Sequence, residues 1–219
     1  MSGQELVVVL GLAPLFEDRS DAGRRLAAEV LRFGAADDPV VVGLARGGVV
    51  VAAEVARELG AELDVVAVRK IGHPWQPEYA IGAVAAGQGA YLRGGFGLTR
   101  QQRENAGALA RERAEELDHR LHRGRPPSRL EGRTCILVDD GLATGATMVA
   151  AIQWARAAGA ARVVAAVPVA AAESVLAIRR AADAFICLHE LHDFGAVGPW
   201  YRDFDPVTEE DLGRLLAAR

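Results

Sequence analysis

Residues 135 to 147 place an apolar strand, two adjacent carboxylates and a loop of small residues in immediate succession. The segment reads Cys-Ile-Leu-Val-Asp-Asp-Gly-Leu-Ala-Thr-Gly-Ala-Thr. The four apolar residues that begin at Cys135 are typical of a buried parallel strand, and the residues after Gly145 carry apolar side chains at helical spacing. A strand that passes through a short loop into a helix is the repeating unit of an α/β fold, so this segment constrains the fold strongly.

The order of strand, turn and helix recurs through most of the chain. The apolar runs that show this order are residues 40–59, 63–68, 134–158, 162–183 and 184–188. Such alternation predicts an α/β fold with a central, mainly parallel sheet and helices on both of its faces. The chain has 219 residues, of which 51% are hydrophobic, so we expect residues 1–219 to form a single domain.

The loop between strand and helix has the composition of a phosphate cradle. The free N–H groups of a first helical turn and the positive end of the helix dipole favour a phosphate dianion. Gly141 and Gly145 let the backbone come close, and Thr144 and Thr147 each offer a hydroxyl donor. The residues expected to form this cradle are Gly141, Leu142, Ala143, Thr144, Gly145, Ala146 and Thr147.

The carboxylates Asp139 and Asp140 stand where the strand ends. Successive strand side chains point to opposite faces, so the two need not share one site. Ionised aspartate only accepts hydrogen bonds, which suits a vicinal ribose diol or the water shell of Mg²⁺. A nucleotide P-loop fits poorly, because three residues separate the glycines and Ala146 stands where its lysine would be. Diol and phosphate recognition side by side indicate a ribose 5-phosphate.

Residues 138–147 closely resemble the phosphoribosyl pyrophosphate (PRPP) signature of type I phosphoribosyltransferases, in which two acids, a short loop and Thr-Gly-x-Thr recur. The resemblance implies the type I phosphoribosyltransferase fold, with a mobile flap and a small hood. It also implies transfer of 5-phosphoribosyl from PRPP to a nitrogenous base, with release of pyrophosphate and with Mg²⁺ held by Asp139 and Asp140 through water. The loop is most like that of adenine phosphoribosyltransferase, because Ala143 stands where hypoxanthine-type enzymes place an aspartate base.

A second strand and turn carry the next match. The strand at residues 40–44 runs into Ala45, Arg46, Gly47 and Gly48 and then into a helix. In the resembled family this position is the pyrophosphate loop, whose backbone amides and one basic side chain hold the leaving group, often through a non-proline cis peptide. The resemblance therefore implies a cis bond between Ala45 and Arg46; the alternative interpretation of Arg46 is a solvated loop arginine.

Composition adds Lys70, the only lysine in a chain with 24 arginines. A compact ammonium meets phosphate differently from a planar guanidinium, so a solitary lysine indicates that geometry matters there. The pair Arg69-Lys70 also resembles the pair that precedes the mobile catalytic loop in adenine and orotate enzymes. The resemblance thus places Lys70 and Arg46 at the donor phosphates and makes them, with Asp139 and Asp140, the catalytic candidates.

Residues 72–98 lose the helical period and predict a loop or hairpin, where the resemblance places the flexible flap. Glu78 and Tyr79 resemble a Glu-Tyr pair in the flap of adenine enzymes, so Glu78 is the candidate general acid or base; the alternative is a solvated charge. Residues 189–219 are the expected hood or C-terminal element. Its aromatic residues could stack on a nucleobase or simply pack together.

Composition limits the partners and the compartment. The net charge is −4 and the pI about 5.8, which disfavours a nucleic-acid partner, although residues 99–122 predict a long charged helix. Cys135 and Cys187 fall in apolar strands and predict buried, reduced thiols. Residues 6–12 indicate an N-terminal strand or extension, and no apolar stretch approaches the ~20 residues that span a bilayer. We therefore expect a cytoplasmic protein without a membrane partner.

The resemblance further implies nucleotide salvage and nucleoside metabolism, a nucleobase-like acceptor and a homodimer. The chain from about Phe16 onward is similar to a group of stand-alone predicted phosphoribosyltransferases whose acceptor is not established. Two alternatives stay open. One is a PRPP-binding regulator that acts on a nucleic acid or a protein without turnover, and the other is a structural relative that has no turnover. A metal site at His189, His192 and Asp193 is a weaker hypothesis, since no further ligand cluster accompanies them.

Overall fold

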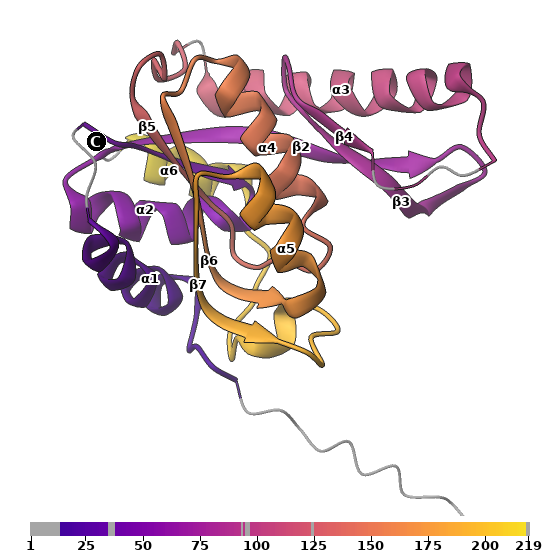
Figure 1. Cartoon of the computed structure of the whole chain (residues 1–219). Coiled ribbons are helices and arrows are strands. Elements are labelled where there is room, and N and C mark those ends of the chain that lie inside the picture. The colour runs from indigo at the N-terminus through magenta and orange to yellow at the C-terminus, as the bar shows by residue number, and fades with distance from the viewer. Residues whose placement is uncertain (1–13, 35–37, 93, 95–96, 124, 218–219) are drawn as a thin grey trace, which may run out of the picture.

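The computed structural model describes residues 14–34, 38–92, 94, 97–123 and 125–217. These residues form one seven-stranded sheet in the order β4-β3-β2-β1-β5-β6-β7 (Figure 1). The strands are β1 (Val40–Ala45), β2 (Glu62–His73), β3 (Gln76–Ala85), β4 (Ala90–Leu92), β5 (Thr134–Val138), β6 (Arg162–Ala171) and β7 (Ala184–Leu191). Five of them, β2, β1, β5, β6 and β7, run parallel, whereas β3 and β4 pair antiparallel. The predicted α/β fold with a mainly parallel sheet is confirmed.

Helices cover both faces of the sheet (Figure 1). They are α1 (Arg19–Phe33), α2 (Gly47–Leu59), α3 (Arg100–His122), α4 (Ala146–Ala157), α5 (Ala172–Ala181) and α6 (Glu209–Ala217). The strands divide their buried side chains between two cores. Val41 and Ile136 pack with α1 and α2, whereas their neighbours Val42 and Leu137 pack with α4. This alternation is the period of two that a strand buried on both faces requires.

β2 continues well past the end of β1. The last pair between these strands joins Ala45 to Ala67, and β2 then runs on to His73. β3 returns along this extension as an antiparallel hairpin, and β4 adds a short third strand. The segment predicted as the flap, residues 72–98, therefore contains the hairpin turn, β3 and β4; its mobility stays a prediction.

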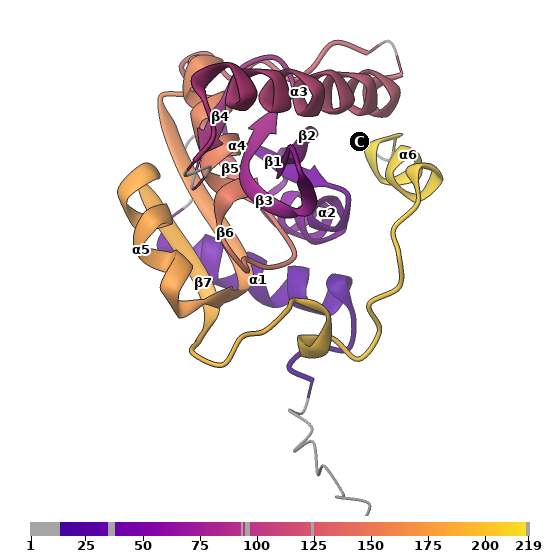
Figure 2. The same cartoon turned by 90° about the vertical axis from the view of Figure 1, so that its right-hand side faces the viewer.

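The hairpin and α3 form a unit that projects beyond the other elements, which we call the arm: β2 from Val68 onward, β3, β4 and α3 (Figures 1 and 2). A small apolar core joins the hairpin to the helix. It consists of Ile71, Ile81, Val84, Leu98 and Ala110. Thr99 begins α3 with a capping box, in which its hydroxyl accepts from the Gln102 N–H and the Gln102 side chain accepts from the Thr99 N–H.

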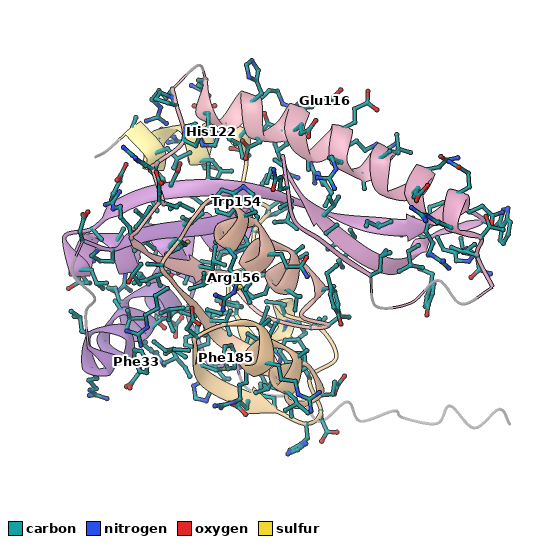
Figure 3. All side chains as sticks on the ribbon, turned by 45° about the horizontal axis from the view of Figure 1, so that its top comes forward. Phe33, Glu116, His122, Trp154, Arg156 and Phe185 are labelled. Atoms are coloured by element: carbon teal, nitrogen blue, oxygen red, sulfur yellow. The ribbon has the colours of Figure 1, made fainter. Side chains whose placement is uncertain are left out.

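A buried ionic cluster fixes the other end of α3 to the sheet. His122 lies between the end of α3 and β2 (Figure 3), with Nε2 3.2 Å from Asp64 Oδ1 and Nδ1 3.1 Å from Asp118 Oδ2. Hydrogen bonds from His122 to Asp118 and Asp64 outweigh burial and raise the pKa of His122 to about 10. Burial raises the pKa of Asp64, but the bonds from His122 and Ser128 give a net lowering. At neutral pH the cluster therefore holds an imidazolium between two carboxylates.

The segment after β7 returns past α1 at the end of the sheet where the parallel strands finish. Its rings pack with Phe16: the centroid of Tyr201 lies 5.4 Å from that of Phe16, and Phe194 lies 6.2 Å from Trp200. These aromatic residues, with Ala22 and Val169, form a buried cluster. Of the two interpretations offered by the sequence, packing is the one that the contacts bear out.

Both cysteines are free thiols. Cys135 is buried and Cys187 is half-buried, and neither forms a disulfide. Burial raises the pKa of each thiol to about 12, so both are protonated at neutral pH. The prediction that residues 6–12 form a strand or an extension lies outside the described residues. No helix in the described part of the chain combines the length and the apolar character needed to cross a membrane.

Candidate active site

The two loops singled out by the sequence meet at the carboxyl ends of β1 and β5. A Cβ atom on Gly47 would stand 1.9 Å from Asp140 Oδ2, and one on Gly48 would stand 2.6 Å from the carbonyl oxygen of Val138. At Gly47 a side chain would collide with the Asp140 carboxylate, and at Gly48 it would collide with the backbone of residues 138 and 139. The glycines therefore allow residues 45–48 to lie directly against residues 138–140, as both strands of this parallel pair end at the same edge.

The first loop joins β1 to α2. The peptide bond between Ala45 and Arg46 is cis, which confirms the bond that the resemblance implied. Arg46 is the N-cap residue of α2, its side chain is exposed, and no side chain caps the helix. The N–H groups of the first turn of α2 therefore point toward the loop without a side-chain acceptor from the N-cap residue.

The second loop joins β5 to α4 and is anchored on both sides. Leu142 is fully buried and pairs with β6, since its N–H donates to Val169 O at 2.9 Å and its carbonyl accepts from Ala171 N at 2.8 Å. Gly145 is the N-cap of α4 at φ +71°, a left-handed conformation that favours glycine, and no side chain caps this helix either. Thr144 is exposed at the loop surface. The loop thus presents an uncapped helix N-terminus on a fixed base, and the Leu142 side chain belongs to the core.

The two carboxylates have different partners. Asp140 Oδ2 accepts from Arg19 Nε at 2.8 Å, and the carbonyl oxygen of Asp140 accepts from the Tyr201 hydroxyl at 2.6 Å. The Arg19 guanidinium in turn stacks on Phe204, 3.8 Å from the ring centroid, and donates to the carbonyl of Asp205. Asp140 is therefore held by α1 and by the C-terminal segment, which together close one side of the site.

Asp139 has a contrasting electrostatic setting. Burial, and next the charge of Asp140, raise its pKa well above the usual range of an aspartate. The N–H of Asp140, which donates to Asp139 Oδ1 at 2.9 Å, and the charges of Arg19 and Lys70 act in the opposite direction. A hydroxyl donor or a cation next to Asp139 would favour its ionised form, so this carboxylate is suited to receive one.

Lys70 and Glu78 lie on the extended hairpin. Lys70 is exposed on β2, three residues beyond Ala67, and close enough for its charge to act on Asp139. Glu78 is exposed on β3 near the hairpin turn, where Gly72 pairs with Ala80 and His73 with Gln76. At about 3.3 Å per residue along a strand, Glu78 stands roughly 15–20 Å beyond the end of β1. The charge of Lys70 thus acts on Asp139 without a direct contact to it, whereas Glu78 lies apart from the carboxylates and its role stays a prediction.

The hypothesis of a metal site at His189, His192 and Asp193 finds no support in the structure. The described residues contain no group of three or more His, Cys, Asp and Glu side chains placed to hold a metal ion. The ring of His189 packs edge-on against Phe16, with 5.8 Å between centroids, and burial lowers the pKa of its imidazole. His189 therefore behaves as part of the aromatic cluster.

Comparison with known families decides what kind of chain this is. A family profile described as the phosphoribosyl transferase domain matches residues 16–202. The chain belongs to this family. The matched residues include both loops, the carboxylates and the whole arm, so the resemblance inferred from the loop sequences extends over most of the domain.

Individual relatives agree with the family assignment. A Mycobacterium tuberculosis H37Rv protein that carries a provisional name as a phosphoribosyl transferase is 43% identical over 208 residues, as is its counterpart in strain CDC 1551. These matches cover 92% of this chain and 46% of the relatives, so the chain spans about half the length of those proteins. The crystal structure of TT1426 from Thermus thermophilus is 45% identical, covers 92% of this chain and 97% of its own, and superposes with a TM-score of 0.78.

The sequence did not indicate that two residues, Arg19 and Tyr201, contact Asp140. Arg19 pairs with Asp140 from 121 positions away, and Tyr201 reaches the same aspartate from 61 positions away. No local pattern marks such distant partners. The one available signal was the position of Asp18 and Arg19 at the start of a helix, where Asp18 is the N-cap of α1.

Proposed function

We propose that this member of the family transfers the 5-phosphoribosyl group of PRPP to a nitrogenous base and releases pyrophosphate. The observation that carries the proposal is the convergence of two helix N-termini without side-chain caps, those of α2 and α4, on one pair of aspartates. Each N-terminus favours an anion, and PRPP carries one phosphate and one pyrophosphate on a ribose whose diol suits carboxylate acceptors.

Each loop then has a distinct part. The N–H groups at the start of α4 and the hydroxyls of Thr144 and Thr147 would bind the 5-phosphate. The loop at residues 45–48 would bind the pyrophosphate, with Arg46 supplying positive charge. Lys70 would approach the same group from β2. The fixed backbone contact between the two loops would hold the 5-phosphate and the pyrophosphate of one PRPP molecule at a set distance from each other.

The reaction forms a bond from a ring nitrogen of the base to C1 of the ribose, and the bond from C1 to the pyrophosphate oxygen breaks with its electron pair. The ribose carries positive charge during this exchange. Asp139 and Asp140 lie where they would stabilise that charge, while Arg46 and Lys70 would stabilise the negative charge on the leaving group. The proton lost by the base requires an acceptor, and Glu78 is the candidate in the flap.

The residues present fit a magnesium ion that is shared with the substrate. Mg²⁺ is commonly bound by one or two carboxylates, several waters and substrate phosphates, without an all-protein cage. Asp139 and Asp140 supply such carboxylates. The pKa of Asp139 is raised by burial and by the charge of Asp140, and a cation bound beside it would lower that pKa. When bound, the ion would neutralise negative charge on the pyrophosphate.

The acceptor is proposed only as a nucleobase-like ring. Ala143 packs at the edge of the aromatic cluster and offers no base, so the aspartate of hypoxanthine-type enzymes has no counterpart there. This favours an acceptor other than hypoxanthine or guanine. A nucleobase acceptor would make the reaction one of nucleotide salvage. We further propose that the protein is a homodimer in the cytoplasm. Size-exclusion chromatography with light scattering would test the oligomeric state.

The test is pyrophosphate release from Mg·PRPP across a panel of purine and pyrimidine bases, with a no-base control and calorimetry of PRPP binding alongside. Release that depends on one base supports the enzyme and identifies its acceptor. Tight PRPP binding with no release from any base would favour the regulator. If PRPP does not bind, the proposal is wrong.

A further inference from the structure

A groove of about 640 Å³ lies within the arm, between the hairpin and α3. Strand alternation places Arg69 and Ile71 on the α3 side of β2 and Lys70 on the other side, so Lys70 forms an edge that the groove shares with the proposed donor site. Its volume is that of a site for a small organic molecule. Apart from Lys70, no residue that lines the groove has a part in the proposed transfer reaction.

The α3 wall of the groove is ordered along the helix. Its residues recur at intervals of three and four, so one stripe of α3 faces the hairpin. The stripe begins with the amides Gln102 and Asn105, continues with the apolar side chains of Ala106, Leu109 and Ala110, and ends with Arg113, Glu116 and Arg120. Pro74 and Pro77 line the hairpin side. The groove thus has an amide end, an apolar middle and a guanidinium end.

The guanidinium end carries excess positive charge. Arg69, Lys70, Arg113 and Arg120 line it with one carboxylate, Glu116, which Figure 3 shows on α3. Arg120 is paired with Glu209, at 3.2 Å from Nε to Oε2. Within the described residues, neither Arg69 nor Arg113 has a salt bridge or a side-chain hydrogen bond. Burial of the half-buried Arg69, and next the charges of Arg46, Arg120 and Arg113, lower the pKa of its guanidinium. A cluster of like charges of this kind favours an anion.

Other arginines of the same helix show what an ordinary surface guanidinium does here. Arg100 pairs with Glu104 at 2.6 Å, one turn along α3. Arg103 donates to the carbonyl of Leu98 at 2.7 Å. Arg69 and Arg113 differ because their side chains line a concave space and have no acceptor among the described residues, whereas Arg120 of the same groove is paired with Glu209.

The other end of the groove offers donors to a polar ring. Gln102 Oε1 accepts from the Thr99 N–H at 2.8 Å, and Asn105 Oδ1 accepts from Gln101 Nε2 at 2.9 Å. Since both amide oxygens are used within the helix, each amide can offer a ligand its NH₂ group. An apolar strip between these donors and the guanidiniums suits a flat ring with its faces covered.

We propose that the groove is a second binding site that takes an organic phosphate of nucleotide size, with the phosphate at Arg69 and Arg113 and the ring over Leu109. The proposal rests on the groove and not on the proposed transfer reaction. The edge shared at Lys70 makes occupancy of the two sites interdependent, because two anions on either side of one lysine compete for its charge.

Calorimetry of the full chain with the donor site saturated by Mg·PRPP tests the proposal. The probes are AMP, GMP, UMP, ATP, GTP, adenosine and inorganic pyrophosphate. Arg113→Ala removes a guanidinium, Leu109→Glu puts a repelling charge in the half-exposed apolar middle, and Arg100→Ala removes one equally charged, well-exposed arginine outside the groove. We expect a nucleotide to bind, about tenfold or more weaker in the first two variants and unchanged in the third.

The probe that binds shows which class of nucleotide the groove takes. Binding of a monophosphate assigns the groove to the product class of the proposed reaction, and binding of a triphosphate alone assigns it to nucleotides made elsewhere. The proposal is overturned if no nucleotide binds below about 1 mM, if pyrophosphate binds as tightly as the nucleotides, or if Arg100→Ala weakens binding as much as Arg113→Ala. If PRPP itself does not bind, the proposed transfer fails, and the same three variants still decide whether the groove binds a nucleotide.

Discussion

The carboxyl edge of the sheet and the arm both collect charged groups, yet they are built in opposite ways. At the edge, the residues of each loop are consecutive in sequence, and backbones touch where Gly48 meets Val138. In the arm, Arg69 lies on a strand and Arg113 lies on a helix, 44 positions apart in the sequence. Side chains from both elements line the groove. The edge presents the N–H groups of two helix N-termini beside a pair of carboxylates, whereas the arm groove is lined by side chains from a strand and a helix.

This difference determines what each region tolerates. Backbone contacts leave no room for change, because a displaced strand end cannot rotate away as a side chain does. A groove of long, exposed side chains tolerates substitutions that alter binding while the fold persists. Variants in the two regions should therefore separate effects on donor binding from effects on the arm.

The largest effect should come from the carboxylates. Replacing both, Asp139→Asn with Asp140→Asn, should weaken Mg·PRPP binding by about a thousandfold or more, since two charge-assisted interactions are lost together. The fold should persist, because Arg19 keeps its contacts with Phe204 and Asp205. Calorimetry measures the affinity and circular dichroism the melting temperature. Unchanged affinity in a folded double variant would remove the pair from the site.

The next largest difference should come from glycine-to-alanine substitutions, which we expect to change the stability of the protein in opposite directions at the edge and in the arm. In Gly48→Ala the new Cβ would stand 2.6 Å from Val138 O and 2.9 Å from Asp139 Cα, so backbone must move, at a cost of about 3 kcal/mol and with loss of donor binding. Gly107→Ala, on α3 in the arm, meets nothing within 4 Å and should stabilise the protein by about 0.5–1 kcal/mol. Urea unfolding compares the two; equal destabilisation would contradict the contrast.

Glu78→Gln tests whether the arm takes part in chemistry. If Glu78 is the general acid or base, kcat should fall by about a hundredfold while the Kd of PRPP stays the same. Steady-state kinetics with the acceptor found in the panel, together with calorimetry, provide both numbers. The exposed position of Glu78 on β3 makes the variant safe for folding. An unchanged kcat assigns Glu78 to the solvated surface.

The smallest expected effect concerns the attachment of the arm. Because the pKa of His122 is raised from 6.5 to about 10, its contribution to stability is complete below pH 6.5 and is lost as the pH rises through 10. His122→Gln should therefore cost about 2 kcal/mol at pH 6.5, and the difference from the unchanged protein should shrink toward pH 10. Urea unfolding of both proteins between pH 6.5 and pH 10 measures this difference in stability. A difference that grows with pH would show that His122 is neutral in the folded protein.

Local sequence was sufficient for the edge because its chemistry is local. Asp139, Gly145 and the cis bond at Ala45–Arg46 lie where the strand-to-loop pattern and the family resemblance placed them. Leu142 shows the limit of that reasoning: it stands among cradle residues, yet its side chain is buried and its backbone pairs with β6. A one-dimensional pattern gives the position of a residue along the loop but not the direction of its side chain.

The sequence by itself determined the α/β fold and the position of two glycine-containing loops between a strand and a helix, since each depends on periodicity, turn chemistry or steric size within a few residues. Tertiary structure alone decided that Arg19 and Tyr201 hold Asp140, that His122 joins α3 to β2, and that Arg69 and Arg113 share a groove. These contacts join residues far apart in the chain. Their partners are selected by how layers pack, and packing is a property of the whole fold rather than of any segment.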